Sequence, residues 1–386
     1  MLSHHQLAPR GVQTCTVAPI CNANVIERRL ERFSEKHRVT LKTLAARHAT
    51  LADLALSFPA LLFALAVPRA GFDPEPVIEQ VINGCGLNEL EKSALLPRWL
   101  RKLLPESFIK PIGILPDGEL FVRQIGNFVP RSPKLAVDWL DSVSLAANWS
   151  HDAFAVWIAR VVTKERRALK TKRLRKLALW SWYSIAKETL GHRLIETPWT
   201  PSIGLEQAVR AANKWLDTAS LHVSVGGIPL TDMWCQPSTV DGYDFVALTT
   251  ANDIAEEAIA MRNCLRAYGE SILYNRSRIW SVRKDGARIA CLSLGQSHGD
   301  ELTAITQLQA RNNGEVPRDV ALAARKWFNT HDLSVINPDR RSWNAVPPDR
   351  QTWTDLWRPY WIAKGRLPDW LPLSPAREAL SSLLWS

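Results

Sequence analysis

The chain has 386 residues, of which 46% are hydrophobic and 22% are charged. These are ordinary globular values, and they exclude a mainly disordered chain, a collagen and a disulfide-stapled miniprotein. The 48 Lys and Arg residues exceed the 38 Asp and Glu residues by ten, which makes polyanions plausible partners. At roughly 150 residues per domain, this length predicts two or three domains.

Cysteine spacing and the first residues of the chain bear on the compartment. The six cysteines are widely spaced, no CxxC pair occurs, and no His is spaced to complete a zinc site. This pattern is typical of reduced cytosolic thiols, and it predicts no metal site and no cofactor. Residues 1–24 lack the apolar stretch of a signal peptide. The most hydrophobic run, Leu54–Val67, is too short to cross a bilayer and contains Pro59. We therefore expect a buried helix pair there, and a cytoplasmic protein without membrane contact.

The N-terminal half reads as mainly helical. We expect a disordered arm over residues 1–24 and a helical region over 25–220, where apolar residues recur at helical spacing between prolines. One exception is a pair of apolar stretches, Ile112–Leu115 and Leu120–Gln124, on either side of a Pro-Asp-Gly turn. This arrangement predicts a β-hairpin within 112–124.

A separate domain is predicted over residues 221–338. Its first segment, Leu221–Pro229, alternates and then breaks at two glycines, which indicates a short strand and a turn. Thr250 or Asn252 can cap a helix that starts near residue 253 and runs to about residue 268.

After this helix the hydrophobic period changes from helical to alternating. The predicted strands of an antiparallel meander are Arg278–Arg283, Arg288–Leu294 and Leu302–Gln309. Apolar residues at helical spacing over 320–328 predict a closing helix. In the tail, residues 339–386, a stripe of Trp353, Trp357 and Trp361 predicts a helix that packs on the domain body. The predicted fold class is α+β: a mainly helical N-terminal region, a small helix, three-stranded meander and helix domain, and a Trp-rich helical tail.

Short motifs in the meander domain resemble those of a known family. Residues 260–265 (AMRNCL) and Tyr268 are followed by the strand sequences RIWSVR and ACLSL and then by ITQLQARNN. In this order they resemble the PcfJ-like family over residues 260–326. The family has a glutamine on the third strand, near a Gly or Arg and an Asn. In this chain the matching residues are Gln307, Arg311 and Asn312 or Asn313. Where many members have His before the Cys, this chain has Asn263. The resemblance implies a setting in conjugative plasmids, integrated elements or phages, and it implies no particular reaction.

Cys264 is a candidate nucleophile. Catalysis by a thiol needs the thiolate, which positive charge favours, and usually a base within hydrogen-bond reach. Arg262 lies two residues away, so on a helix it does not project beside the thiol. Asn263 removes the local base, and only the distant His298 or His331 could serve. A thiol packed in the core is the favoured interpretation.

A set of polar side chains forms a second candidate site. If the strand face that carries Ser281 and Arg283 lines a groove, Arg283 and Gln307 could converge with Arg311 on an anionic group such as phosphate. The alternative is that Gln and Asn side chains hold the loop 310–317 through backbone hydrogen bonds. The candidate catalytic residues are Arg262, Cys264, Tyr268, Arg283, Gln307 and Asn312.

The third feature is a basic run. Residues 164–176 (KERRALKTKRLRK) hold eight basic residues and one acid. On one continuous helix Arg166, Lys170 and Arg173 would share a face, which suits phosphate contact without sequence reading. A calmodulin-target or membrane-surface helix, or a solvated surface, are the alternatives. The candidate nucleic-acid-binding residues are Arg166, Arg167, Lys170, Lys172, Arg173, Arg175 and Lys176.

Three functional hypotheses follow from these features. The first is an accessory factor in plasmid or phage DNA handling, which binds nucleic acid through the basic helix and has another mobile-element protein as a further candidate partner. The second is an enzyme that acts on a nucleic acid or a nucleotide through the polar set. The third is a scaffold that binds another protein through the Trp-rich tail.

Overall fold

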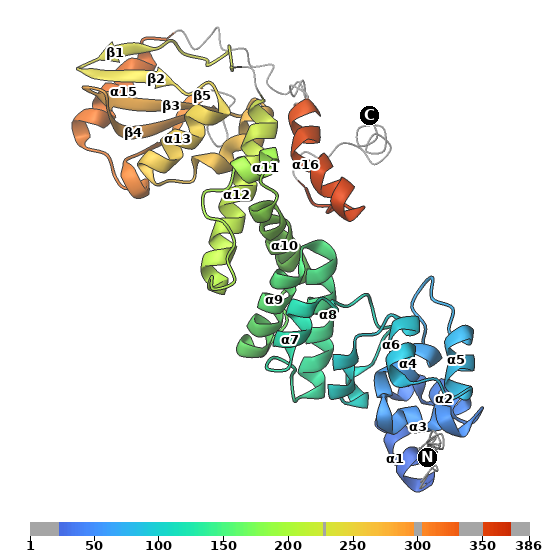
Figure 1. Ribbon diagram of the computed structural model, residues 1–386. Helices are drawn as coiled ribbons and strands as arrows, with labels where there is room; N and C mark the ends of the chain where they lie inside the picture. Colours follow the sequence, from blue (N-terminus) through green and yellow to red (C-terminus); the bar gives the residue numbers. More distant parts are fainter. Residues whose placement is uncertain (1–22, 227–228, 297–302, 332–349, 372–386) are drawn as a thin grey trace, which may run out of the picture. The chain divides into compact units, whose positions relative to one another are not determined.

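The computed structural model describes residues 23–226, 229–296, 303–331 and 350–371 (Figure 1). Its contacts divide the chain into two compact units. The first unit comprises residues up to 147 together with 155–168, and the second comprises 148–154 together with 169 onward. The boundary that the sequence indicated near residue 220 lies inside the second unit. The arm expected over 1–24 lies almost wholly outside the described residues, as do Trp343 and Trp385 of the tail.

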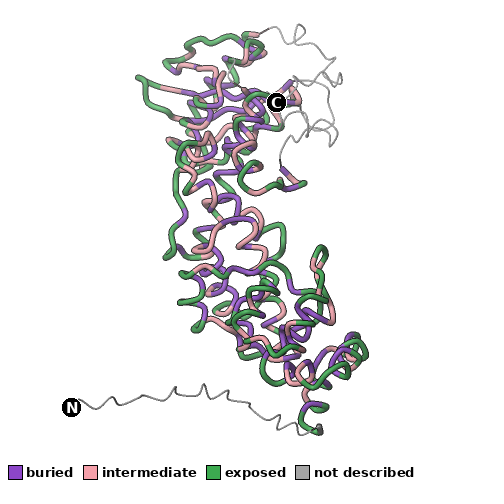
Figure 2. Tube along the Cα trace, turned by 45° about the vertical axis from the view of Figure 1, so that its right-hand side comes forward, coloured by how far each residue is buried: buried purple, intermediate pink, exposed green. Residues whose placement is uncertain are grey.

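Short helices build the first unit. They are α1 Ala23–Leu30, α2 Glu35–Ala45, α3 Ala49–Ser57, α4 Pro59–Ala66, α5 Glu75–Ile82, α6 Leu87–Ala94, α7 Glu119–Ile125 and most of α8 Pro133–Trp149 and α9 Asp152–Glu165, with the 3-10 turns η1 Arg98–Lys102 and η2 Pro105–Ser107. The apolar run Leu54–Val67 forms the expected helix pair, because Pro59 ends α3 and opens α4. Each of these helices except α4 has both buried and exposed residues along its length (Figure 2). Among the described residues no helix has the length and apolarity needed to span a membrane.

The hairpin predicted within 112–124 is wrong. Residues 112–118 form no strand, and the second apolar stretch is α7. Phe121 and Ile125 are buried, whereas Leu120 and Val122 are 39% and 45% exposed. Burial thus follows the helical period of i and i+4 rather than strand alternation. The Pro-Asp-Gly sequence begins a helix at the N-cap Gly118 instead of closing a turn.

The described helices of the second unit that lie outside its sheet domain are α10 Thr171–Ile185, α11 Leu190–Arg193, α12 Leu205–Val225 and α16 Arg350–Lys364. The short strand predicted at 221–229 is wrong as well, because α12 continues to Val225 and ends at Gly226, whose φ is +67°. Leu221, Val223 and Val225 are all buried. Other elements enclose this end of α12 on several sides, so apolar alternation here reflects general burial and not a strand.

A five-stranded antiparallel sheet follows, with strands in chain order (Figure 1). The strands are β1 Ser238–Val240, β2 Tyr243–Ala247, β3 Ser277–Lys284, β4 Ala287–Gln296 and β5 Thr303–Gln309. The last three are the predicted meander, and the prediction of only three strands is wrong because β1 and β2 extend it. Two-residue Asp-Gly turns join β1 to β2 and β3 to β4. Both residues of each turn have positive φ, which gives the type I′ geometry that matches strand twist.

Helices cover both faces of the sheet. On one face Trp280 and Val282 pack against α15 (Arg318–Asn329), whose Trp327 ring stacks on Phe245 at 4.5 Å. On the other face Ile279 packs with α13 (Ala251–Met261) and the end of α12. The alternation expected along β3 therefore places Ser281 and Arg283 on the α13 side.

The helix expected over 253–268 is divided. Thr250 caps α13 by accepting a hydrogen bond from the backbone N–H of Asp253, whose carboxylate accepts in return from the N–H of Thr250. The helix ends at Met261, because Arg262 has a left-handed φ of +53°. A 3-10 turn, η3 Leu265–Tyr268, and α14 (Gly269–Leu273) follow. A side chain at Gly269 would meet the backbone of Leu221 at 2.9 Å, so this close packing on α12 requires the glycine.

The described part of the Trp-rich tail packs within the second unit. In α16, Trp353 and Trp357 are buried, and the Trp357 ring lies 6.0 Å from that of Trp215 on α12. The hydroxyl of Tyr360 donates to the carbonyl of Trp149 at 2.7 Å. These indole rings are core groups of the unit.

Candidate functional site

The basic run 164–176 does not form one helix, and that prediction is wrong. α9 ends at Glu165, Arg166 adopts a left-handed φ of +53°, and α10 begins at Thr171 with Lys170 as its N-cap. A continuous helix would place like charges at i,i+4, such as Arg166 with Lys170, and these pairs destabilise helices. The common face of Arg166, Lys170 and Arg173 therefore does not exist.

The break separates the basic residues into groups with different roles. Arg166 and Arg167 are exposed and belong to the first unit. Arg175 is engaged within the second unit, because its guanidinium lies 4.8 Å from the ring centre of Trp149 and 3.7 Å from the carboxylate of Asp369. Of the five other basic residues of the run, four surround one hollow. They are Lys170, Lys172, Arg173 and Lys176.

This hollow, which we call the basic groove, lies between the first turns of α10 and the N-terminal half of α12. Its volume is about 330 Å³. The floor is apolar, with Leu177 and Ala212 buried and Val209 half-buried. The amide of Asn213 completes the lining. The groove thus combines a cationic rim with an aliphatic floor.

The cations of the rim differ in their partners. The ammonium group of Lys176 donates to Oδ1 of Asn213 at 2.8 Å. Burial lowers the pKa of Lys176, while the carboxylate of Asp217 opposes that shift. Across the described residues, no carboxylate lies within 4.0 Å of the charged groups of Lys170, Lys172 or Arg173. Three cations are therefore available to an anion.

The backbone adds donors at the same place. The N-cap of α10, Lys170, makes no side-chain capping hydrogen bond. The first N–H groups of a helix have no partner within the helix and carry a partial positive charge. They reinforce the potential that the side chains of the rim create.

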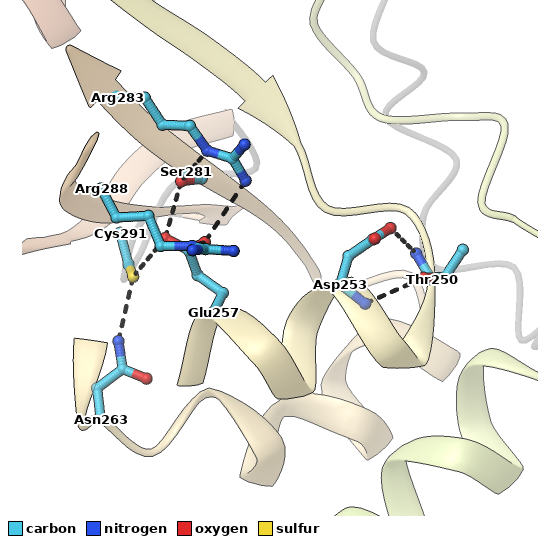
Figure 3. Close-up of polar contacts among 8 residues, drawn as sticks. All are labelled: Thr250, Asp253, Glu257, Asn263, Ser281, Arg283, Arg288 and Cys291. Atoms are coloured by element: carbon cyan, nitrogen blue, oxygen red, sulfur yellow. Dashed lines mark hydrogen bonds and ion pairs between the residues drawn. The ribbon is translucent and has the colours of Figure 1, made fainter. Parts of the chain in front are cut away.

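A second polar site lies between α13 and the sheet (Figure 3). The side chain of Glu257 is completely buried. Its carboxylate accepts from the hydroxyl of Ser281 at 2.8 Å and from Nε of Arg288 at 2.8 Å, and Nη2 of Arg283 lies 3.7 Å away. Ser281 in turn accepts from Nε of Arg283 at 3.1 Å. We call these four residues the Glu257 network. The anion that Arg283 meets is thus an internal carboxylate rather than a ligand.

The network continues to a buried thiol. Sγ of Cys291 lies 3.7 Å from Oε1 of Glu257, and Nδ2 of Asn263 donates to Cys291 Sγ at 3.1 Å (Figure 3). Burial, and then the nearby carboxylate, raise the pKa of Cys291 to about 12. A thiol with so high a pKa carries almost no thiolate at neutral pH and is a poor nucleophile.

Part of the predicted catalytic set meets in a small crevice on the other side of this thiol. Cys264, Tyr268 and Gln307 line it, and the Tyr268 hydroxyl donates to Oε1 of Gln307 at 2.5 Å. Burial raises the pKa of Tyr268. The cavity measures about 10 Å³, so it encloses about one water molecule. A larger substrate would have to lie outside it, against the exposed side chains of Cys264 and Gln307.

The other members of that set lie elsewhere. Arg262 and Asn312 are exposed and do not line the crevice, whereas Asn313 does. Cys264 is exposed, so the expectation of a packed core thiol is wrong. The expectation assumed that the helical stripe continues, but α13 has already ended at Met261.

No base accompanies Cys264 among the described residues that line the crevice. His298 lies outside the described residues. His331 is engaged elsewhere, since its Nε2 accepts from the backbone N–H of Gln236 at 3.0 Å and its ring lies 5.1 Å from that of Trp327. The described part of the chain also contains no group of three or more His, Cys, Asp or Glu side chains suited to a metal ion.

Sequence reasoning missed the Glu257 network, although a signal was present. Ile254, Ala258 and Met261 form the buried stripe of α13, and Glu257 stands within it at the i+3 position. A carboxylate within an apolar stripe requires partners of opposite charge. The basic groove had no such signal, because its two walls come from helices that are far apart in the sequence.

No family model, curated protein or solved structure matches this chain. The resemblance to the PcfJ-like family consequently rests on the short motifs of residues 260–326 alone.

Proposed function

We propose that this protein binds nucleic acid through phosphate contacts made by the basic groove. The observation that carries the proposal is the set of three cations, Lys170, Lys172 and Arg173, that surround one hollow without a carboxylate partner among the described residues. Some surface cations elsewhere in the second unit pair with acids, as Lys326 does with Asp241 at 2.6 Å and Lys214 with Glu196 at 2.7 Å. These three cations of the rim are distinguished because, within the described ranges, they are unpaired and surround one hollow. Unpaired cations beside a helix N-terminus suit phosphate oxygens.

The chain's charge supports the same proposal. A formal net charge of +10 attracts polyanions over distances of about a Debye length. The resemblance of residues 260–326 to the PcfJ-like family adds a setting to it, an accessory role in plasmid or phage DNA handling with another mobile-element protein as a candidate partner. The phosphate contacts do not depend on that setting.

The proposal is tested by fluorescence anisotropy of a labelled oligonucleotide at low salt. The groove variant combines Lys170→Ala, Lys172→Ala and Arg173→Ala. The matched control combines Lys187→Ala, Arg318→Ala and Arg325→Ala, which remove the same charge from exposed positions elsewhere. We expect the groove variant to lose at least tenfold in affinity, because each charge-assisted contact contributes about 1 kcal/mol or more, and the control to stay within about twofold. Equal losses in both variants would refute the proposal, since only the overall charge would then matter.

An enzymatic function is the second candidate. The crevice brings together Cys264, Tyr268 and Gln307 from separate elements, and this juxtaposition favours it. Gln307→Ala tests it, since Gln307 is exposed and lies outside the Glu257 network. Arg283→Ala is unsuitable because it would break a structural contact. Loss of turnover of a nucleotide or oligonucleotide with unchanged stability would support this function, and turnover at the wild-type level would exclude this site.

Two of the described tryptophans of the tail give no support to the scaffold hypothesis, whereas Trp361 and Trp370 are half-buried. Trp353 and Trp357 are 1% and 0% exposed, so a partner protein cannot reach these rings while the second unit is folded.

A further inference from the structure

If the basic groove bound only phosphate, its apolar floor would have no role. Val209 is half-buried and is the apolar side chain of the floor that a ligand can contact, whereas Leu177 and Ala212 are buried and support it. Phosphate contacts need only cations and N–H donors. An aliphatic floor below three available cations instead suits a ligand that is anionic at one edge and apolar on a flat face.

A nucleotide has this division of chemistry. Its phosphate carries the charge, and its base has an apolar face that packs against aromatic or aliphatic side chains once it leaves the stack. The groove volume of about 330 Å³ is at the lower end of small-molecule sites, which span roughly 300–1,000 Å³. It therefore accommodates a ligand about as large as one nucleotide.

Duplex and single strand differ in access to such a floor. In a duplex the bases are stacked and paired, so only the backbone can approach the rim. In a single strand a base can turn toward the floor while the flanking phosphates stay near the cations. The cations of the rim therefore contribute equally to the affinity for duplex and single strand, whereas the apolar floor contributes only to the affinity for the single strand.

We propose that the basic groove seats one unpaired base of a single-stranded nucleic acid against Val209, which Leu177 and Ala212 support from the core, with the flanking phosphates on Lys170, Lys172 and Arg173. This proposal rests on the proposed function, since it assumes that the rim binds phosphate. It adds a preference for single strands over duplexes and assigns that preference to the floor.

The test compares three labelled probes against the full chain by fluorescence anisotropy: an oligothymidylate of about 16 nucleotides, a duplex of equal length, and an abasic oligonucleotide with the same number of phosphates. The floor variant is Val209→Asn, which makes the floor polar without changing charge. The matched control is Gln207→Asn, an exposed position on the same helix that does not line the groove.

For the wild type and the control we expect the oligothymidylate to bind roughly five- to tenfold more tightly than the abasic probe. In the floor variant this ratio falls to about one, while affinity for the abasic probe is unchanged. Circular dichroism confirms that the variants are folded.

Two results would overturn the inference and leave the phosphate proposal standing: equal wild-type affinity for the oligothymidylate and the abasic probe, or an unchanged ratio in the floor variant. Displacement of the oligothymidylate by equimolar thymidine monophosphate would also overturn it, because the groove would then be a site for free nucleotides. If none of the three probes binds, both the proposed function and this inference fail.

Discussion

The Glu257 network makes a strong prediction about stability. Glu257→Gln keeps the shape of the side chain and an oxygen that can still accept from Ser281. It replaces the oxygen that faces Arg288 Nε at 2.8 Å with an amide donor, so two donors oppose each other. We expect this single substitution to loosen the contact between α13 and the sheet.

The magnitude follows from the contacts that are lost. A hydrogen bond to a charged group contributes about 1.5–3 kcal/mol, and the longer contact to Arg283 at 3.7 Å contributes about 0.5 kcal/mol or less. The side chains of Arg283 and Arg288 are 28% and 35% exposed, so water can solvate them in part. This places the loss below the roughly 3–5 kcal/mol of a fully buried broken pair. We predict a loss of about 2–3 kcal/mol.

Hydrogen–deuterium exchange read by mass spectrometry measures this loss locally, which matters because a chain with two units need not unfold in one step. Peptides that cover β3 and β4 should exchange about 30- to 150-fold faster in the variant, and peptides from α8 residues 133–147 in the first unit should not change. The matched control is Glu256→Gln, an exposed neighbour on α13, and it should match the wild type. Exchange in β3 and β4 within threefold of the wild type would refute the structural role assigned to Glu257.

Two further predictions concern titratable groups. Burial, and then the nearby ammonium of Lys364, lower the pKa of His151 to about 4. The unfolded chain, with a His pKa of about 6.5, therefore binds more protons than the folded chain between these values. Stability should then be fully present above about pH 6.5 and fall by about 2 kcal/mol, discounted for partial exposure, as the pH drops to about 4. Thermal unfolding across this range checks the slope, and a slope that is unchanged in His151→Asn would contradict the assignment. The second unit contains three thiols, and an alkylating reagent should modify that of Cys264 first. Cys264 is exposed, whereas burial raises the pKa of Cys235 to about 11 and that of Cys291 to about 12. Peptide mapping of the native protein checks this order, and prior labelling of Cys291 would contradict it.

The elements that were predictable are those where local pattern and turn chemistry agree. In β3 and β4 apolar and polar residues alternate on either side of an Asp-Gly turn, and both strands are present in the folded chain. β1 has only three residues, of which Val240 alone is strongly apolar. Its sequence therefore carries no strand pattern of its own, and it forms a strand because it pairs with β2. The stretch over 119–125 contains adjacent apolar residues, which fit the spacing of a helix as well as that of a strand. Phe121 and Ile125 are the two that are buried, and their separation of four residues is that of a helix.

The candidate site was less predictable than the fold, for a physical reason. The basic run shows that cations are concentrated, but not which of them are engaged. Arg175 and Lys172 look alike in sequence, yet Arg175 lies over Trp149 and Lys172 lines the groove. The floor joins Leu177 to Val209, and no local pattern indicates that these segments meet.

The salt dependence of single-strand binding tests the central claim most directly. Each phosphate contact to a single strand contributes about −0.7 to the slope of log K against log salt. With three available cations on the rim the groove should contribute about −2 to the slope of the wild type, and the variant without the charges of Lys170, Lys172 and Arg173 should show a slope shallower by about 2. Identical slopes for the two proteins would contradict the account, because the phosphates would then be bound elsewhere on the chain.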